Sequence, residues 1–570
     1  MIPFPGTPDA SPRSEVIFSS LRPGALRGVR VVGSRSGWHR GAVSALPAGA
    51  GTAFKPNRPF LAGEHVWVKA KLGSPGAGTG LGDPGARRIA FSFTVAKPAS
   101  AEAAPSARPA PSSTAGQAPP TQARAARAWY PLMHFHSAPG LQPPRMTVSS
   151  DPDTQSGQIF LALRPNKFTS GHHFHGGPMI LNSQGQLVWF GQGHYANNLQ
   201  VQSYRGRPVL TWLRRDTYVI YNRHYQRVAA VRAGNGYRTD MHDFQLTRRG
   251  TAYIAGTGAV QANLSSVGGP SSGTVEDDVI QEVDVQTGQV LWEWHAYGHI
   301  PLTASYNPPQ SGFDDYFHLN SIQPLSDGNL LVSARNTWAI YKISRRTGRV
   351  LWTLGGKNSS FRMGPGTNFE WQHDARLSGR TLTLFDDADH PQEERQSSAK
   401  ILRLDTHAHP MTARLVGRYV HRPRVLSPAQ GSAQLLPNGN IFVGWGIKPV
   451  FSEYAPDGRQ IFTGSFPLGI NSYRALRFRW VGDPLTAPAL DVVRSSRRQD
   501  TLYFSWNGAT QVAFWRVLGG PRSRSLKQLR KVPKKSFETR VRLQGPPAYL
   551  AVQALDAKGH VLHTSKVRRG

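Results

Sequence analysis

The chain has 570 residues, 39% of them apolar, and this length exceeds the size at which a single hydrophobic core stops growing, so about two to four domains are expected. It contains no cysteine, which excludes disulfides, thiolate metal sites and cysteine nucleophiles, and no apolar stretch approaches the roughly 18 residues that a membrane span needs. The formal charge of +33 favours anionic partners of any kind, but a compositional bias toward arginine along the whole chain explains it better than one dedicated binding face.

The N-terminal part predicts a small all-β domain followed by a linker. Residues 1–97 contain short alternating runs (EVIFSSL, VRVVGS, HVWVKAKL, RIAFSFTVA) separated by Pro and Gly turns, which is typical of a β-sandwich. Residues 98–128 are almost entirely Ala, Pro, Ser, Thr, Gln and Arg, which cannot bury a core. We expect this second segment to be an extended or disordered linker.

Residues 129–485 repeat one unit, in which a turn glycine opens a short apolar strand. The six turn glycines are Gly157, Gly206, Gly250, Gly328, Gly379 and Gly439. A second strand type recurs out of phase with the first, in QGQLVWF, TGQVLWEW and TGRVLWTL, so each unit has room for a four-stranded sheet. Six radially arranged sheets protect their edges by closing a β-propeller. The long interval before Gly328 predicts an insertion near residues 258–278.

The C-terminal residues 486–570 again alternate, in TLYFSWNG, QVAFWRVL and YLAVQALD, and predict an immunoglobulin/fibronectin-like β-sandwich. Its stretch PRSRSLKQLRKVPKK is rich in Lys and Arg. A solvated loop between strands is favoured here over a polyanion site. The predicted fold class is therefore all-β, with a six-bladed β-propeller between two sandwiches.

Three histidines stand at equivalent places in the repeat. His242, His318 and His373 lie eight, ten and six residues before a turn glycine. In a propeller these positions lie on successive blades and face one axis, with Asn320 on the same strand face as His318 and Arg335 at the end of the next strand. Three imidazoles also suit a metal, but a fixed guanidinium nearby favours an oxyanion.

Aromatic residues beside these positions suggest a slot for a flat ring. Tyr316 and Phe317 precede His318, and Trp371 precedes His373. Packing between blades is an equally good interpretation of each of them.

The segments HDFQ, FHLNSI, the Arg after LLVSA, and WQHDAR resemble the bacterial aryl-sulfate sulfotransferases, which need no nucleotide donor. The resemblance extends over most of residues 129–460, including TGQVLWEW, TGRVLWTLGG and GSAQLLPNGNIFVGWG. It implies that His373 attacks the sulfur of an aryl sulfate, becomes a transient sulfohistidine and passes the group to a phenolic acceptor in a ping-pong mechanism. His242, His318, Asn320 and Arg335 would then surround the sulfuryl oxygens.

The resemblance also sets expectations about cofactors, partners and location. No GxxxxGK[ST] loop is present, which is consistent with a mechanism that uses no nucleotide donor. The resemblance implies a small aryl sulfate and a phenol as substrates, and we expect no cofactor, no metal and no specific nucleic acid. The basic charge suggests electrostatic association with an acidic cell surface, and the oligomeric state stays open. Related proteins suggest secretion, whereas the first residues lack a secretory signal, so either the protein is cytoplasmic or an export signal is missing from this sequence.

Two alternatives remain open from the residues alone. EVDVQTGQVLW and KISRRTGRVLW match an Asp-x-x-Thr-Gly-x-x-x-Trp pattern of quinoprotein dehydrogenase propellers, with Ser344 replacing Asp in the second copy, although only six units are visible where eight are needed. The other alternative is a non-catalytic cell-surface propeller that binds polyanions or glycans with its basic faces.

Overall fold

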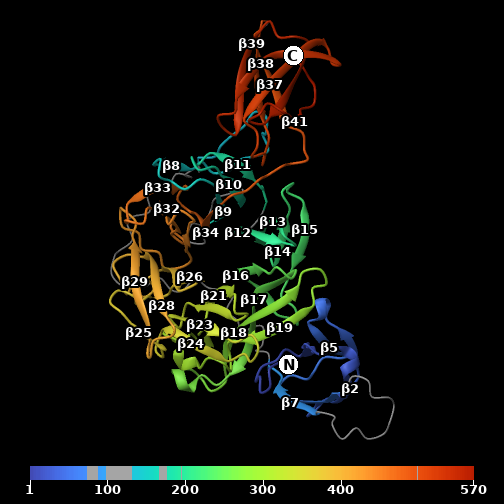
Figure 1. Ribbon diagram of the computed structural model, residues 1–570, viewed down its shortest axis with the longest axis vertical. Coiled ribbons are helices and arrows are strands. Elements are labelled where there is room, and N and C mark those ends of the chain that lie inside the picture. Colours follow the sequence, from blue (N-terminus) through green and yellow to red (C-terminus); the bar gives the residue numbers. More distant parts are fainter. Residues whose placement is uncertain (73–87, 98–130, 166–175, 194–195, 497) are drawn as a thin grey trace.

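The computed structural model describes residues 1–72, 88–97, 131–165, 176–193, 196–496 and 498–570. These residues form β-strands and four 3-10 helices, and no α-helix occurs among them. None of the helices in these ranges is both long and apolar enough to cross a membrane. The short helices are η1 (Pro23–Ala25), η2 (Pro47–Gly49), η3 (Ser265–Val267) and η4 (Leu302–Ala304). In Figure 1 the N-terminal sheets and the C-terminal sheets lie at opposite ends of a larger central body.

The N-terminal residues form two antiparallel sheets that share one core. The first sheet has the order β1 (Val16–Ser19), β5 (Gly51–Pro56), β4 (Gly41–Ala45), and the second has the order β3 (Gly37–His39), β2 (Leu26–Gly33), β6 (His65–Leu72), β7 (Arg88–Thr94). In β6, Val66, Val68 and Ala70 are buried while Trp67 and Lys69 between them are exposed, as strand alternation requires. The buried valines pack in one cluster with Phe18 of the first sheet.

The central body consists of six four-stranded antiparallel sheets, which we call ring sheets one to six. Ring sheets one to three are β34 (Ile470–Phe478), β9 (Gln158–Pro165), β10 (Gly177–Leu181), β11 (Leu187–Phe190); β12 (Asn197–Tyr204), β13 (Arg207–Arg214), β14 (Thr217–Tyr221), β15 (Arg227–Val231); and β16 (Arg238–Leu246), β17 (Thr251–Ala262), β18 (Gly273–Asp284), β19 (Val290–His295). Ring sheets four to six are β21 (Leu319–Pro324), β22 (Leu330–Ala334), β23 (Ala339–Ile343), β24 (Val350–Gly355); β26 (His373–Ser378), β27 (Thr381–Asp386), β28 (Ser398–Asp405), β29 (Met411–Tyr419); and β30 (Ser432–Leu435), β31 (Ile441–Gly444), β32 (Val450–Tyr454), β33 (Gln460–Ser465). Three further strands extend these sheets: β8 (Thr147–Ser150) pairs with β33, β20 (Phe313–Asp314) with β18, and β25 (Phe361–Met363) with β29.

The first strands of the six sheets form a closed ring. Strand β34 contacts β12, and the contacts continue through β16, β21, β26 and β30 back to β34. Ring sheet one is completed by pairing β9 with β34, which lies about three hundred residues further along the chain. The arrangement is propeller-like. The six inner strands lie together around the centre of the ring.

The six turn glycines that define the sequence repeat all have positive φ, between +57° and +132°. Gly250 and Gly328, at +80° and +82°, occupy tight turns in the left-handed region that favours glycine. The long interval between these two glycines contains a hairpin in which Thr251–Ala262 pairs with Gly273–Asp284 over its full length. Most of the insertion predicted at 258–278 therefore forms the far end of this hairpin.

The C-terminal residues form two further antiparallel sheets around their own core, which includes Leu502, Trp515 and Val552. One sheet has the order β35 (Ala489–Ser496), β36 (Gln499–Ser505), β39 (Glu538–Gln544), and the other has the order β38 (Ser525–Pro533), β37 (Phe514–Arg522), β40 (Tyr549–Leu555), β41 (Val561–Thr564), with β42 (Arg568–Arg569) paired to β40. The basic stretch predicted as a loop is in fact the end of β37, a turn, and the edge strand β38. An edge strand is open to solvent on several sides, so basic residues are tolerated along it and protect the edge.

The predicted linker, residues 98–128, lies outside the described residues. The domain limits predicted at residues 97, 129 and 485 stay predictions.

Candidate active site

The three repeat-equivalent histidines gather at the inner strands of three successive ring sheets. His242 lies within β16, His318 directly precedes β21, and His373 begins β26. The ring centroids of His242 and His318 are 4.9 Å apart. The ring of Tyr473, from β34, lies 5.6 Å from that of His242 and 6.3 Å from that of His373, so one phenol ring packs against both.

Each of these histidines has a carboxylate at Nδ1. The Nδ1 atoms of His242 and His318 each lie 2.6 Å from an oxygen of Asp240 and Asp315 respectively. The corresponding distance from His373 to Asp387 Oδ2 is 2.7 Å. A carboxylate acceptor at Nδ1 holds a proton on that nitrogen, so Nε2 is the atom available for proton transfer or attack.

His373 differs from the other two in burial. Its side chain is 2% exposed, against 13% for His242 and 29% for His318. Its Nε2 accepts a hydrogen bond from the backbone N–H of Gln430 at 3.2 Å. Burial, followed by the positive charge of Arg335, lowers the pKa of His373 well below its ordinary value. The neutral imidazole, with an unshared electron pair on Nε2, is therefore the stable form in this environment.

Arg335 follows β22, and its guanidinium stacks on the ring of Trp371 with 4.6 Å between the guanidinium carbon and the ring centroid. It donates from Nη2 to Pro428 O at 3.0 Å and from Nη1 to Asn336 Oδ1 at 2.8 Å. The stacking and the two hydrogen bonds fix the plane of the Arg335 guanidinium, the group with which arginine binds oxyanions. Trp371, two residues before His373, thus holds the guanidinium of Arg335 in place.

The backbone is strained where the site residues enter their strands. His318, Trp371 and Asp374 have φ of +56°, +59° and +54°, which non-glycine residues rarely adopt. Such conformations persist only where the surrounding structure enforces them, and they occur frequently at functional sites.

Asn320 is fully buried and connects three ring sheets. Its Nδ2 donates to Gln372 O at 2.7 Å, on the approach to β26. Its backbone carbonyl accepts hydrogen bonds from Arg474 Nη2 at 3.0 Å and from the Tyr473 hydroxyl at 3.3 Å. The side-chain amide of Asn320, which the sequence suggested as a donor to the substrate, thus already donates one N–H to the backbone next to β26.

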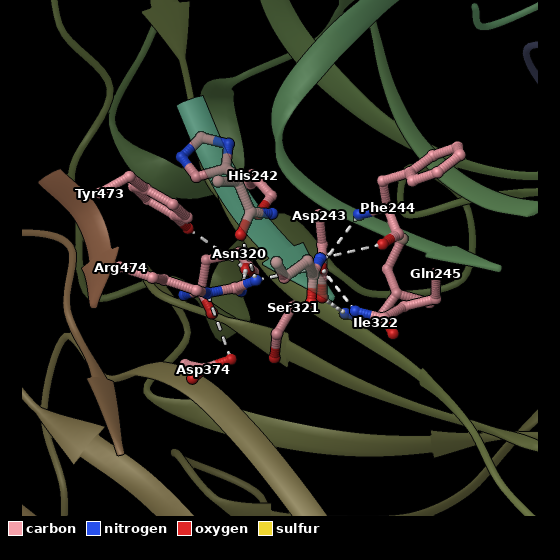
Figure 2. Close-up of polar contacts among 12 residues, drawn as sticks. His242, Asp243, Phe244, Gln245, Asn320, Ser321, Ile322, Asp374, Tyr473 and Arg474 are labelled. Atoms are coloured by element: carbon pink, nitrogen blue, oxygen red, sulfur yellow. Dashed lines mark hydrogen bonds and ion pairs between the residues drawn. The ribbon is translucent and has the colours of Figure 1, made fainter. Parts of the chain in front are cut away.

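A network of two aspartates and two arginines lies beside the histidines, and Figure 2 shows much of it. Asp243 contacts Arg474 Nη1 at 3.0 Å and Arg376 Nη2 at 2.8 Å. Asp374 contacts Arg474 Nε at 3.2 Å and Arg376 Nη2 at 2.8 Å. The two arginines lower the pKa of Asp243, which is fully buried. Asp243 and Asp374 are the residues that directly follow His242 and His373 in the sequence. The ion network that they form with the two arginines joins β16, β26 and β34.

Tyr316 and Phe317, the aromatic residues before His318, pack into a hydrophobic cluster. Both side chains are fully buried. The ring of Phe317 packs 6.0 Å from Trp294 and 5.6 Å from Tyr341, within the cluster that holds ring sheets three and four together. The chain turns at His318 and directs the two preceding residues into the core, which favours the packing interpretation of both positions, and the ring-binding role stays a prediction.

Several site residues carried no role in the sequence interpretation. They are Asp240, Asp315, Asp387, Gln430, Tyr473 and Arg474. A weak signal existed for the first two, since an acidic residue stands two or three positions before His242 and His318. Tyr473 and Arg474 lie on the closing strand β34, which contains no histidine and is not followed by a turn glycine, so the repeat gives no signal there.

The chain belongs to the arylsulfotransferase (ASST) family, whose model matches residues 171–467. Membership implies a sulfotransferase that acts on small aryl sulfates. The matched range includes the three histidines, Asn320 and Arg335. No curated protein matches the chain.

Solved structures give only weak likenesses. A Bacteroides caccae protein of unknown function is 13% identical, with 57% of this chain and 100% of that chain covered and a TM-score of 0.35. A catalytically inactive virginiamycin B lyase from Staphylococcus aureus with quinupristin is 8% identical, with 64% and 96% covered and a TM-score of 0.30. A GH43 protein from Bacillus licheniformis is 10% identical, with 74% and 91% covered and a TM-score of 0.25. At these scores the likenesses support no argument about mechanism.

Proposed function

We propose that the chain is an aryl-sulfate sulfotransferase built on a six-bladed β-propeller between two β-sandwiches, the second of them immunoglobulin/fibronectin-like, and that His373 carries the sulfuryl group between donor and acceptor. The observation that carries the proposal is the pairing of a buried, neutral His373 with Asp387, beside Arg335 and two partly exposed histidines.

In the first half-reaction, Nε2 of His373 attacks the sulfur of the aryl sulfate, and a nitrogen–sulfur bond forms as the bond from sulfur to the aryl oxygen breaks. The leaving aryloxide keeps that electron pair and takes a proton from a protonated His242 or His318. Positive charge develops on the sulfated imidazole, and Asp387 stabilises it through the Nδ1–H.

In the second half-reaction, a phenolic acceptor loses its proton to the imidazole that gave one up, and its oxygen attacks the same sulfur. The nitrogen–sulfur bond breaks, and its electron pair returns to Nε2 of His373. Sulfuryl transfer has a loose transition state whose charge lies on the peripheral oxygens, by analogy with phosphoryl transfer. Arg335, fixed on Trp371, supplies a preorganised cation for those oxygens.

The structure offers little support for the quinoprotein alternative. Asp284 of the first Asp-x-x-Thr-Gly motif accepts hydrogen bonds from the backbone N–H of Gln286 and Thr287, at 3.0 and 2.8 Å. Trp292 of the same motif donates through Nε1 to Arg345 O at 2.8 Å, on the next ring sheet. The motif thus forms a turn and a contact between neighbouring sheets, which is a packing role.

The decisive experiment incubates the full chain with p-nitrophenyl sulfate alone and measures the intact protein mass. We expect the mass of one sulfuryl group to be added to the protein and then lost when phenol is supplied, with one nitrophenol released per transfer. His373→Gln should show neither change. His421→Gln is the matched control, since His421 is also buried but hydrogen-bonded to Pro423 O, outside the site. A wild-type chain that gains no mass, while remaining folded, would argue for a binding propeller instead.

A further inference from the structure

A buried group of acidic side chains surrounds His295 where the N-terminal segment meets ring sheet three. Asp9 comes from the N-terminal segment, Asp277 from β18, and Glu293 and His295 from β19. All four residues are 3% exposed or less. One donor atom each from Asp9, Asp277 and His295 lie within 4.8 Å of one another.

The charges in this group do not balance. Asp9, Asp277 and Glu293 offer three negative charges, and His295 is the only residue in the described part of the chain that forms an ion pair with any of them. Even a fully protonated imidazole leaves the equivalent of two negative charges buried. Burial of unpaired charge is strongly unfavourable, and proteins resolve it with protons, ion pairs or bound metal ions.

The outer contacts of His295 are those of a metal ligand. Its Nε2 lies 3.1 Å from Glu293 Oε1, and its Nδ1 lies 2.7 Å from Asp277 Oδ2, so each nitrogen has a carboxylate partner. A metal bound at Nδ1 would replace the proton between Nδ1 and Asp277, while Nε2–H continues to donate to Glu293. Glu293 is held in turn by the side-chain amides of Asn235 at 2.8 Å and Gln281 at 2.6 Å. Asp277 is oriented through its other oxygen, which accepts the backbone N–H of Tyr297 at 2.9 Å.

The group also includes buried oxygens without a hydrogen-bond partner among the described residues. Neither carboxylate oxygen of Asp9 has a hydrogen-bond partner among the described residues, although the residue is 2% exposed. The buried hydroxyl of Tyr237 also lacks one within those ranges, and its ring lies 5.6 Å from that of His295.

We propose that Asp9, Asp277 and Nδ1 of His295 bind a divalent transition-metal ion of the Zn²⁺ or Mn²⁺ type, which ties the N-terminal segment to ring sheet three. One imidazole with carboxylates suits such ions, whereas Ca²⁺ prefers six to eight oxygens. Two ligands of a tetrahedral Zn²⁺ lie about 3.3 Å apart. The distances from His295 Nδ1 to Asp9 Oδ2 and Asp277 Oδ2 are 3.4 and 2.7 Å, so binding needs only a small outward movement of Asp277.

A second acidic group in the described residues lacks these features. Glu370, Asp386 and Glu394 also bring donor atoms together. There, however, the ammonium of Lys400 lies 2.5 Å from Asp386 and 3.4 Å from Glu394 and already supplies a cation. The second acidic group thus already has a lysine cation, and Arg418 also pairs with Glu394, whereas the only cationic partner of the first group in the described part of the chain is a histidine.

The test measures metal bound to the full chain by elemental analysis, and then titrates chelator-treated protein with Zn²⁺, Mn²⁺ and Ca²⁺ by calorimetry. We expect one equivalent of a transition metal per chain and a higher melting temperature on its return, with little response to Ca²⁺. Asp9→Asn should weaken binding by more than about 100-fold, and Glu293→Gln by about 10- to 100-fold. Glu15 is a carboxylate on the same N-terminal segment, but it pairs with Lys55. The Glu15→Gln variant should therefore bind the metal as the wild type does.

Two outcomes would overturn the proposal. One is a folded, chelator-treated wild-type chain that takes up neither Zn²⁺ nor Mn²⁺ and whose His295 has protons on both nitrogens by NMR, since the imidazolium would then be the buried cation. The other is unchanged affinity in Glu293→Gln together with Asp9→Asn. If Asp9→Asn fails to fold, the wild-type titration and Glu293→Gln decide the question alone.

Discussion

His373 and Asp387 form a buried pair in which Nδ1 of the imidazole lies 2.7 Å from Oδ2 of the carboxylate. His373 lies at the start of β26, and Asp387 follows β27, its partner in the same hairpin. The strand register therefore sets the orientation of the imidazole. This relationship and its surroundings lead to four predictions.

Asp387→Asn should slow the first half-reaction by about 100-fold or more, because the amide no longer stabilises the positive charge that develops on the sulfated imidazole. Stopped-flow measurement of nitrophenolate release in a single turnover tests this, and thermal unfolding checks that the variant is folded. A rate within a few-fold of the wild type would remove Asp387 from the mechanism.

The first half-reaction should persist in mildly acidic solution. Only unprotonated His373 can attack, and burial together with nearby cations, Arg335 foremost, lowers its pKa well below the ordinary value of 6.5. An unperturbed histidine would lose half of its reactive form at about pH 6.5, whereas His373 should lose it only at lower pH. Burst rates measured across pH test the sign of the shift, and an acid limb centred at or above pH 6.5 would contradict it.

Replacement of Arg335 should move that acid limb. Burial is the first cause of the lowered pKa of His373, and Arg335 is the first among the nearby charges, so Arg335→Met should shift the limb upward. The rate should also fall by about 100-fold as an oxyanion partner is lost. Arg335→Lys keeps the charge but not the flat fork that stacks on Trp371, so the rate should fall while the limb stays in place. Identical limbs in the wild type and both variants would show that Arg335 does not act on His373.

The ion network at the inner strands should matter for stability. Arg474→Met leaves Asp243 and Asp374 with one arginine between them, and the loss of one partner from a buried pair destabilises proteins by about 3–5 kcal/mol. Urea unfolding of the variant measures the change, with Arg459→Met as a control because Arg459 forms its ion pairs at the surface. A loss below about 1 kcal/mol would mean that Arg376 alone satisfies both carboxylates.

The sequence predicts the parts of the site that the repeat marks. A histidine before three of the six turn glycines indicates equivalent depth on successive sheets, and the rings of His242 and His318 do lie together. The all-β class and the positive φ of the turn glycines are likewise visible as local patterns. These features depend on neighbours within about ten residues, which a single sequence displays directly.

The remaining parts of the site depend on pairing between distant strands. Asp387 reaches His373 only through the register of a hairpin, and Tyr473 reaches it only through closure of the ring. Proximity in sequence is misleading at Phe317, because the backbone has positive φ at His318 and the residues on either side have different surroundings. The edge strand β38 is missed because exposure on several sides removes the alternation that marks other strands.

Strand β34 closes the ring, since Ile470–Phe478 pairs with Gln158–Pro165. The same strand contributes Tyr473 and Arg474 to the site. The family match ends at residue 467, before this strand begins, and starts after β9 has ended. A fragment trimmed to the matched residues would lack both β9 and β34. An excised catalytic unit therefore has to extend at least from residue 147 to residue 478.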